Sequence, residues 1–179
     1  KQEKWYRLAA KTDPQMPQAF LNLGIALALQ RQFKEAIDPL RDADRVYRAD
    51  KEHNPQEKHY GRALGWLTIC LLETGNLEQA DKTLLTVSKE DRNGIVLEAA
   101  LRVAIAQGFA QQAFSRIQSL RVTRPEDVPM QYVRILALRS LGQTQEAKDG
   151  LQRLIDQIPP DHMVYRFQLN HWKQLMSEP

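Results

Sequence analysis

The chain has 179 residues, which suits one ordinary domain or one compact repeat array. Apolar residues make up 42% of it, too many for a disordered chain. The net charge is only +3 and no five like charges stand together, which argues against a basic nucleic-acid-binding arm.

The cysteine content and the hydropathy narrow the class further. Cys70 is the only cysteine, so an internal disulfide and a cysteine zinc cluster are excluded. A lone cysteine does not identify the compartment, so we leave the localisation of a soluble protein open between the cytoplasm and the periplasm. No apolar run approaches the roughly 20 residues of a membrane helix, so we expect no membrane insertion.

The first part of the chain reads as three helices. Residues 2–11 form the first, which ends before Pro14 because the residue before proline avoids helical geometry. Pro17 opens the second, which runs to about residue 30, since the first helical position needs no N–H donor. The third spans about 33–48, and Pro39 inside it predicts a kinked or broken helix.

Seven further helices are predicted after the polar stretch 51–60. Asn54-Pro55 marks the start of the first, with an asparagine cap and proline in the first helical position. The predicted spans are 55–74, 77–88, 94–108, 110–122, 128–141, 144–157 and 161–176. In the last helix, the spacing predicts that Leu169 and Trp172 pack on the preceding pair. The other face is predicted to meet water, with Arg166, Asn170 and Lys173.

Small residues recur at a period near 34. The recurring alanines are Ala36, Ala80, Ala113 and Ala147, which stand 44, 33 and 34 residues apart in turn. A glycine precedes each of the last three by five residues, at Gly75, Gly108 and Gly142. An alanine where two helices cross lets their axes approach, and a glycine between helices supplies a left-handed cap.

This pattern resembles the tetratricopeptide repeat family. The first helix pair fits it at Phe20, Leu23, Gly24, Leu27, Ala36 and Leu40, and the second at Leu64, Leu67, Thr68, Leu71, Ala80 and Leu84. The third and fourth pairs depart from it, with Leu101 and Ile135 where small residues are usual. In the fourth pair, Gln131 and Arg134 also stand where apolar residues are usual. The resemblance implies an all-α fold, a right-handed α-solenoid of antiparallel helix pairs with a C-terminal capping helix.

The register divides one solenoid domain into seven parts. They are a second helix of a preceding partial repeat (1–16), repeat 1 (17–50), a polar insertion (51–60), repeat 2 (61–93), repeat 3 (94–127), repeat 4 (128–160) and the capping helix (161–179). Because the chain begins inside a repeat, we expect either that it is a segment of a longer protein or that the preceding part of the repeat is degenerate.

No constellation of catalytic residues is recognisable. The chain lacks a phosphate-binding glycine loop, a His-Glu-x-x-His motif and paired cysteines. His53 and His59 are interpreted as solvated side chains of the polar stretch rather than metal ligands. Cys70, among Ile69 and Leu71, is predicted to be a buried, inert thiol. We therefore predict no enzymatic activity, no metal and no cofactor.

The resemblance implies where a partner would bind, because the first helix of each pair lines a concave groove in this family. The register projects eleven residues onto that face: Asn22, Ile25, Leu29, Arg62, Trp66, Ile69, Glu73, Glu98, Arg102, Tyr132 and Arg139. Within each helix, the projected residues stand three, four or seven positions apart, so they lie on the same side of that helix. Aromatic, aliphatic and arginine side chains are those that interface hot spots favour. Ile25, Leu29 and Ile69 equally suit contacts between repeats, and Trp66 equally suits the core.

Two functions follow from these observations. The first is a non-catalytic scaffold that binds a peptide or protein segment in the concave groove, as part of a larger protein or assembly. The alternative is a structural or regulatory segment attached to a catalytic or secretion-related domain outside this chain.

Some members of the tetratricopeptide repeat family grip a peptide's terminal carboxylate with lysines and asparagines. Leu21 and Ile25 occupy two of those positions, so that clamp is predicted to be absent.

Overall fold

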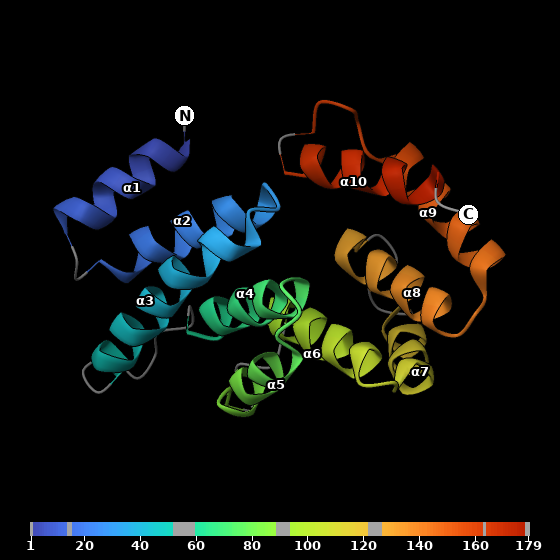
Figure 1. Ribbon diagram of the computed structural model, residues 1–179, viewed down its shortest axis with the longest axis horizontal. Helices are drawn as coiled ribbons and strands as arrows, with labels where there is room; N and C mark the ends of the chain where they lie inside the picture. The colour runs from blue at the N-terminus through green and yellow to red at the C-terminus, as the bar shows by residue number, and fades with distance from the viewer. Residues whose placement is uncertain are drawn as a thin grey trace. The chain divides into compact units, whose positions relative to one another are not determined.

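The computed structural model describes residues 2–13, 16–51, 60–88, 94–121, 127–162 and 164–177. These ranges contain ten helices and no strand (Figure 1). The helices are α1 (Gln2–Thr12), α2 (Pro17–Leu29), α3 (Phe33–Lys51), α4 (Tyr60–Glu73), α5 (Leu77–Leu85), α6 (Gly94–Ala106), α7 (Ala110–Arg121), α8 (Val128–Ser140), α9 (Thr144–Gln157) and α10 (Arg166–Ser177). The predicted all-α class is confirmed, and the handedness of a superhelix stays a prediction.

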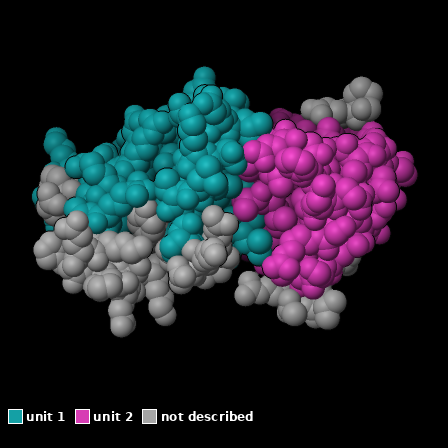
Figure 2. Space-filling view, turned by 90° about the horizontal axis from the view of Figure 1, so that it is seen from below, with its two compact units in different colours: residues 1–99 teal, residues 100–179 magenta. Residues whose placement is uncertain are grey.

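The chain forms two units, residues 1–99 and residues 100–179 (Figure 2). In unit 1, the first five helices pack in succession, from α1 on α2 to α4 on α5, and α2 also contacts α4. The first helices of two successive pairs therefore lie side by side. In unit 2, α8 packs on α7 and on α9, and α10 packs on α9.

The turns inside the helix pairs share one geometry. Gly75, Gly108 and Gly142 have φ of +82°, +91° and +75°, the left-handed region that glycine adopts without strain. The N–H of Gly142 donates to the carbonyl of Arg139 (3.1 Å) and the next N–H donates to that of Leu138 (2.9 Å). This pair of hydrogen bonds is the Schellman motif, and it recurs at the other two glycines. The predicted glycine caps are confirmed.

Arg31 occupies the same position in the turn between α2 and α3. Its φ is +61°, and its N–H donates to the carbonyl of Ala28 (2.9 Å). Each cap glycine likewise donates its N–H to the carbonyl of the residue three positions before it. A non-glycine residue in this conformation costs roughly 1–2 kcal/mol. The side chain offsets part of that cost, because its guanidinium lies 3.8 Å from a carboxylate oxygen of Glu73 and 5.1 Å from the ring centroid of Phe33.

We expect Arg31→Gly to be more stable than Arg31→Ala by about 1 kcal/mol. Both variants lose the contacts with Glu73 and Phe33, but only glycine relieves the left-handed backbone. Urea denaturation followed by circular dichroism measures the difference. Gly142→Ala is the converse variant, and its free energy of unfolding should fall by about 1 kcal/mol. No atom would crowd the added Cβ, so the positive φ alone opposes the alanine. Equal stability of the two Arg31 variants would contradict the strain.

The repeat alanines lie where the helices meet. Ala36, Ala80, Ala113 and Ala147 are all buried, with at most 2% of each exposed. In unit 1, a Cβ on Gly24 would stand 2.5 Å from Leu40 Cγ, so α2 and α3 approach as closely as glycine permits. The hydroxyl of the buried Thr68 donates to the carbonyl of Leu64 (2.8 Å). This polar group therefore finds its hydrogen-bond partner within its own helix.

The core of unit 2 gathers between α8, α9 and α10. Leu169 and Trp172 of α10 are buried, and Arg166, Asn170 and Lys173 are exposed, as predicted for this helix. The Trp172 ring lies 5.0 Å from that of Tyr132, centroid to centroid. The remaining buried members of the cluster are Ile135, Leu138, Ala147, Leu151, Leu154 and Ile158.

The helix bounds correct some of the predictions. Helix α3 continues through Pro39, with buried Ala36, Leu40 and Ala43 on either side of the proline, so a break is excluded, and a kink at the proline stays a prediction. Helix α5 ends at Leu85 rather than near residue 88. Helix α10 begins at Arg166 rather than at residue 161.

The late start of α10 has a local cause. The Nδ1 atom of His162 accepts hydrogen bonds from the backbone N–H groups of Val164 (3.3 Å) and Tyr165 (3.4 Å). A side chain that bonds nearby backbone in this way competes with the helix. The predicted helix start at Asn54-Pro55, and the insertion apart from residues 51 and 60, lie outside the described residues.

Candidate partner-binding faces

Except for Glu98 on α6, the predicted residues of unit 1 lie on α2 and α4. Asn22, Ile25 and Leu29 are half-buried on α2, Trp66 is half-buried on α4, and Arg62 and Glu73 are exposed. We call these six residues the α2–α4 face. The two helices hold equivalent places, because Ala36 and Ala80 stand 44 residues apart and so do Asn22 and Trp66. Helices α2 and α4 also contact each other.

A hydrogen-bonded chain positions Asn22. The hydroxyl of the buried Tyr47, on α3, donates to Gln18 Oε1 (3.0 Å). The amide nitrogen of Gln18 then donates to Asn22 Oδ1 (2.9 Å). With its oxygen fixed as an acceptor, the Asn22 amide turns its two N–H donors away from Gln18. The Asn22 amide is therefore held in one orientation by contacts within the protein.

The opposite end of the face is an ion pair. Glu73 at the end of α4 lies 3.8 Å from Arg31, and the side chains are 25% and 28% exposed. Exposed pairs of this kind contribute at most about 1 kcal/mol. The face thus runs from an amide at Asn22, over partly exposed apolar side chains, to paired charges at Glu73.

In unit 2 the structure brings two of the predicted residues together. The guanidinium carbon of Arg102 lies 5.2 Å from the centroid of the Tyr132 ring. Trp172 also lies against Tyr132, which is only 7% exposed. Arg139 is exposed at the last turn of α8, where it lines a small pocket with residues of α9 and α10.

Three of the predicted binding residues belong to the interior. Ile69 is 3% exposed, Glu98 is 6% exposed and Tyr132 is 7% exposed. The reason is clearest for Tyr132, because α10 folds onto the side of α8 that the repeat register assigned to the groove. A surface proposed for partners must therefore omit these three side chains.

Sequence reasoning overlooked Gln18 and Tyr47. The spacing of Gln18 and Asn22, four apart on one helix, could have indicated the first contact. Nothing local indicated that Tyr47, on another helix, would complete the chain.

Several features bear on chemistry. Among the described residues, no three His, Cys, Asp or Glu side chains are grouped to hold a metal ion. Within the described ranges, none of the helices has the length and apolar character that crossing a membrane requires. Cys70 is fully buried, as predicted. His53 and His59 lie outside the described residues.

Comparison with known proteins identifies one stretch. Residues 132–159 match the family model described as tetratricopeptide repeat. The match starts inside α8, crosses the Gly142 turn and covers all of α9.

The matched stretch falls on the fourth helix pair, which departs from the family pattern at Arg134. That arginine takes an apolar position by lying over the Phe114 ring (5.6 Å) while pairing with Glu146 (2.5 Å). No curated protein matches the chain.

Proposed function

We propose that this tetratricopeptide repeat protein is a non-catalytic binding module that takes a protein or peptide segment on its α2–α4 face. Repeats of this family generally mediate protein–protein interaction. The further step, from the family to this face, rests on the residues that unit 1 presents there.

The positioned amide of Asn22 is the observation that carries the proposal. Its support reaches back through Gln18 to the buried Tyr47, so the amide keeps its orientation without a partner. A donor fixed in advance binds a peptide carbonyl without the entropy cost of ordering a mobile side chain. Asn22 therefore suits recognition of extended backbone, which every peptide offers.

Partly exposed apolar groups supply the second element. Ile25 and Leu29 follow Asn22 along α2, and Trp66 occupies the equivalent place on α4. A half-buried tryptophan keeps a rigid body in the protein and leaves part of its ring for contact, as interface hot spots do. A segment with one or two apolar side chains beside its backbone hydrogen bonds fits this face.

Selection from a random-peptide display library tests the proposal. We expect peptides selected on the parent chain to bind Trp66→Ala at least about tenfold more weakly, which corresponds to about 1.4 kcal/mol. Asn22→Ala should weaken the same peptides. Isothermal titration calorimetry measures both, and circular dichroism confirms that the variants stay folded.

Arg45→Ala is the matched control, because Arg45 is exposed on α3 and its salt bridge with Asp42 stays within that helix. Its peptide affinity should equal that of the parent. Selected peptides that bind the Trp66 and Asn22 variants as tightly as the parent would show that the α2–α4 face is not the binding surface.

A further inference from the structure

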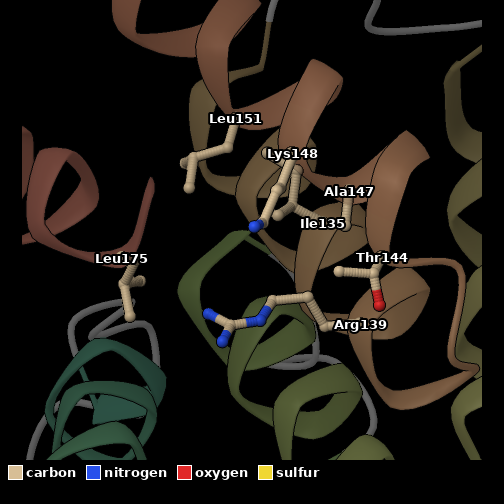
Figure 3. Close-up of a pocket in the computed structure, with 7 residues that line it drawn as sticks. All are labelled: Ile135, Arg139, Thr144, Ala147, Lys148, Leu151 and Leu175. Atoms are coloured by element: carbon tan, nitrogen blue, oxygen red, sulfur yellow. The ribbon is translucent and has the colours of Figure 1, made fainter. Parts of the chain in front are cut away.

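The outward side of α10 carries a row of exposed polar side chains. Arg166, Asn170 and Lys173 stand four and three positions apart, so they share one side of the helix, and we call them the α10 row. The opposite side of α10 faces the protein. Trp172 is buried there, and Leu175 lines a small pocket with residues of α8 and α9 (Figure 3). The α10 row therefore points away from the fourth helix pair.

The two cations of this row form no ion pair within the part of the chain that the structure describes. Helix α10 contains no aspartate or glutamate. The nearest acidic residues in the sequence are Asp161 and Glu178, five positions from Arg166 and Lys173 respectively. Ion pairs along a helix need a spacing of three or four. The sequence itself thus gives neither cation an acidic neighbour along the helix.

The exposed arginines of α3 show the more usual arrangement. Arg41, Arg45 and Arg48 lie 3.7, 2.9 and 2.9 Å from aspartates three or four positions before them. The two units differ in total charge in the same sense. Residues 1–99 contain fifteen basic and fifteen acidic residues, whereas residues 100–179 contain ten and seven. The net charge of +3 therefore comes from unit 2, to which α10 belongs.

Helix stability does not account for the cation at Arg166. It is the first residue of α10, where the helix dipole is positive and an acidic side chain would be the stabilising choice. Its guanidinium carbon lies 4.5 Å from the centroid of the Phe167 ring, and this contact restrains the side chain. An arginine that stacks on a ring keeps the N–H groups of its edge for a carboxylate. A charge that opposes local stability and is held in place suits a role in binding.

We propose that the α10 row binds an acidic helix of a protein partner, which places two carboxylates, two turns apart, on Arg166 and Lys173. The two cations are seven positions apart, which is about 10.5 Å along a helix. Side chains on one face of a strand are about 7 or 14 Å apart, so an extended segment does not match that distance. A partner helix that lies along α10 repeats it. The amide of Asn170 stands between the cations and can bond a polar side chain of that helix.

The charge pattern favours a protein helix over a nucleic acid. A nucleic-acid surface needs a concentrated cluster of lysine and arginine that neutralises successive phosphates. The α10 row offers two cations with the neutral Asn170 between them. A carboxylate near Arg166 would also meet the positive end of the α10 dipole. This surface belongs to unit 2 and is separate from the α2–α4 face of unit 1.

Binding of designed helical peptides to the full chain tests the proposal. The matched peptide has about 20 residues, mostly alanine and glutamine, and is long enough to form a helix. It carries two glutamates seven positions apart. The mismatched peptide has the same composition, with its glutamates five positions apart and so on different sides. Circular dichroism checks that the two are equally helical. In NMR titrations that follow the amides of α10, we expect the matched peptide to bind at least about fivefold more tightly. Raising the salt should reduce that preference.

Arg166→Gln and Lys173→Gln should each remove most of the preference for the matched peptide. Arg153→Gln is the matched control, because Arg153 is an exposed cation on α9 of the same unit and lies outside the row. This variant should keep the preference. The double variant Arg166→Glu and Lys173→Glu should instead prefer a matched peptide in which lysines replace the glutamates. Thermal melts that equal the parent's exclude unfolding as the cause.

No binding of the matched peptide, or equal binding of the matched and mismatched peptides, would overturn the proposal. An equal loss with Arg153→Gln would also overturn it, because the effect would then be one of total charge. A single-stranded RNA of about eight nucleotides is the last probe. Tighter binding of this RNA than of the matched peptide would assign the row to a nucleic acid instead.

Failure here is distinct from failure of the proposed function. Trp66→Ala should leave binding of the matched peptide unchanged, because Trp66 belongs to the α2–α4 face of the other unit. Arg166→Gln should in turn leave the library-selected peptides bound as tightly as by the parent. A loss of the matched peptide with Trp66→Ala would show that it binds on the α2–α4 face and would overturn the assignment to α10.

Discussion

Trp172→Ala is expected to lower the free energy of unfolding by about 3–5 kcal/mol. Trp172 is 3% exposed and anchors α10 on the fourth helix pair. Its ring lies 5.0 Å from Tyr132 and 6.4 Å from Tyr165, centroid to centroid. Removing it leaves a cavity between α8, α9 and α10 and ends both aromatic contacts, which add to the area term. Circular dichroism in urea measures the loss without relying on tryptophan emission.

Lys173→Ala is the control for this substitution, because the neighbouring side chain is exposed and should change stability by no more than about 0.5 kcal/mol. A stability of Trp172→Ala within 1 kcal/mol of the parent, on the order of a surface change, would mean that α10 does not cap the fold. The variant has a second use. If α10 detaches, Tyr132 becomes exposed, and any gain in peptide binding would show that α10 covers a groove residue.

Leu40→Ala is expected to cost about 2–5 kcal/mol, because Leu40 is fully buried where α2 and α3 meet. Gly24→Ala should also destabilise, by about 1–3 kcal/mol, since the new Cβ would stand 2.5 Å from Leu40 Cγ. The double variant removes that clash and lets the added methyl fill part of the cavity. Its loss should therefore be smaller than the sum of the single losses.

Gly150→Ala in α9 is the matched comparison, because its Cβ would stand 3.3 Å from Ile135 Cγ1, a tight but adjustable contact. The better helix propensity of alanine, worth about 1 kcal/mol, should offset that crowding. Additive losses for Gly24→Ala and Leu40→Ala in urea denaturation would show that the two residues do not share one crossing.

The sequence alone predicted the features that depend on neighbours along the chain. Glycine five residues before an alanine indicated the left-handed caps at Gly75, Gly108 and Gly142, because such a turn is closed by its own backbone hydrogen bonds. The same count would have placed Arg31 in that conformation. Helical spacing likewise predicted which side of α10 is buried, since residues three and four apart share a face whatever covers it.

Tertiary structure decided what covers each face. Tyr132 and Arg139 share one side of α8, but α10 returns over Tyr132 and leaves Arg139 at the rim of a pocket. That pocket takes Lys148 from α9 and Leu175 from α10, residues that no local spacing connects. The chain from Tyr47 through Gln18 to Asn22 likewise joins two helices. A helical period fixes directions around one axis, whereas the partner on each side depends on how distant segments pack.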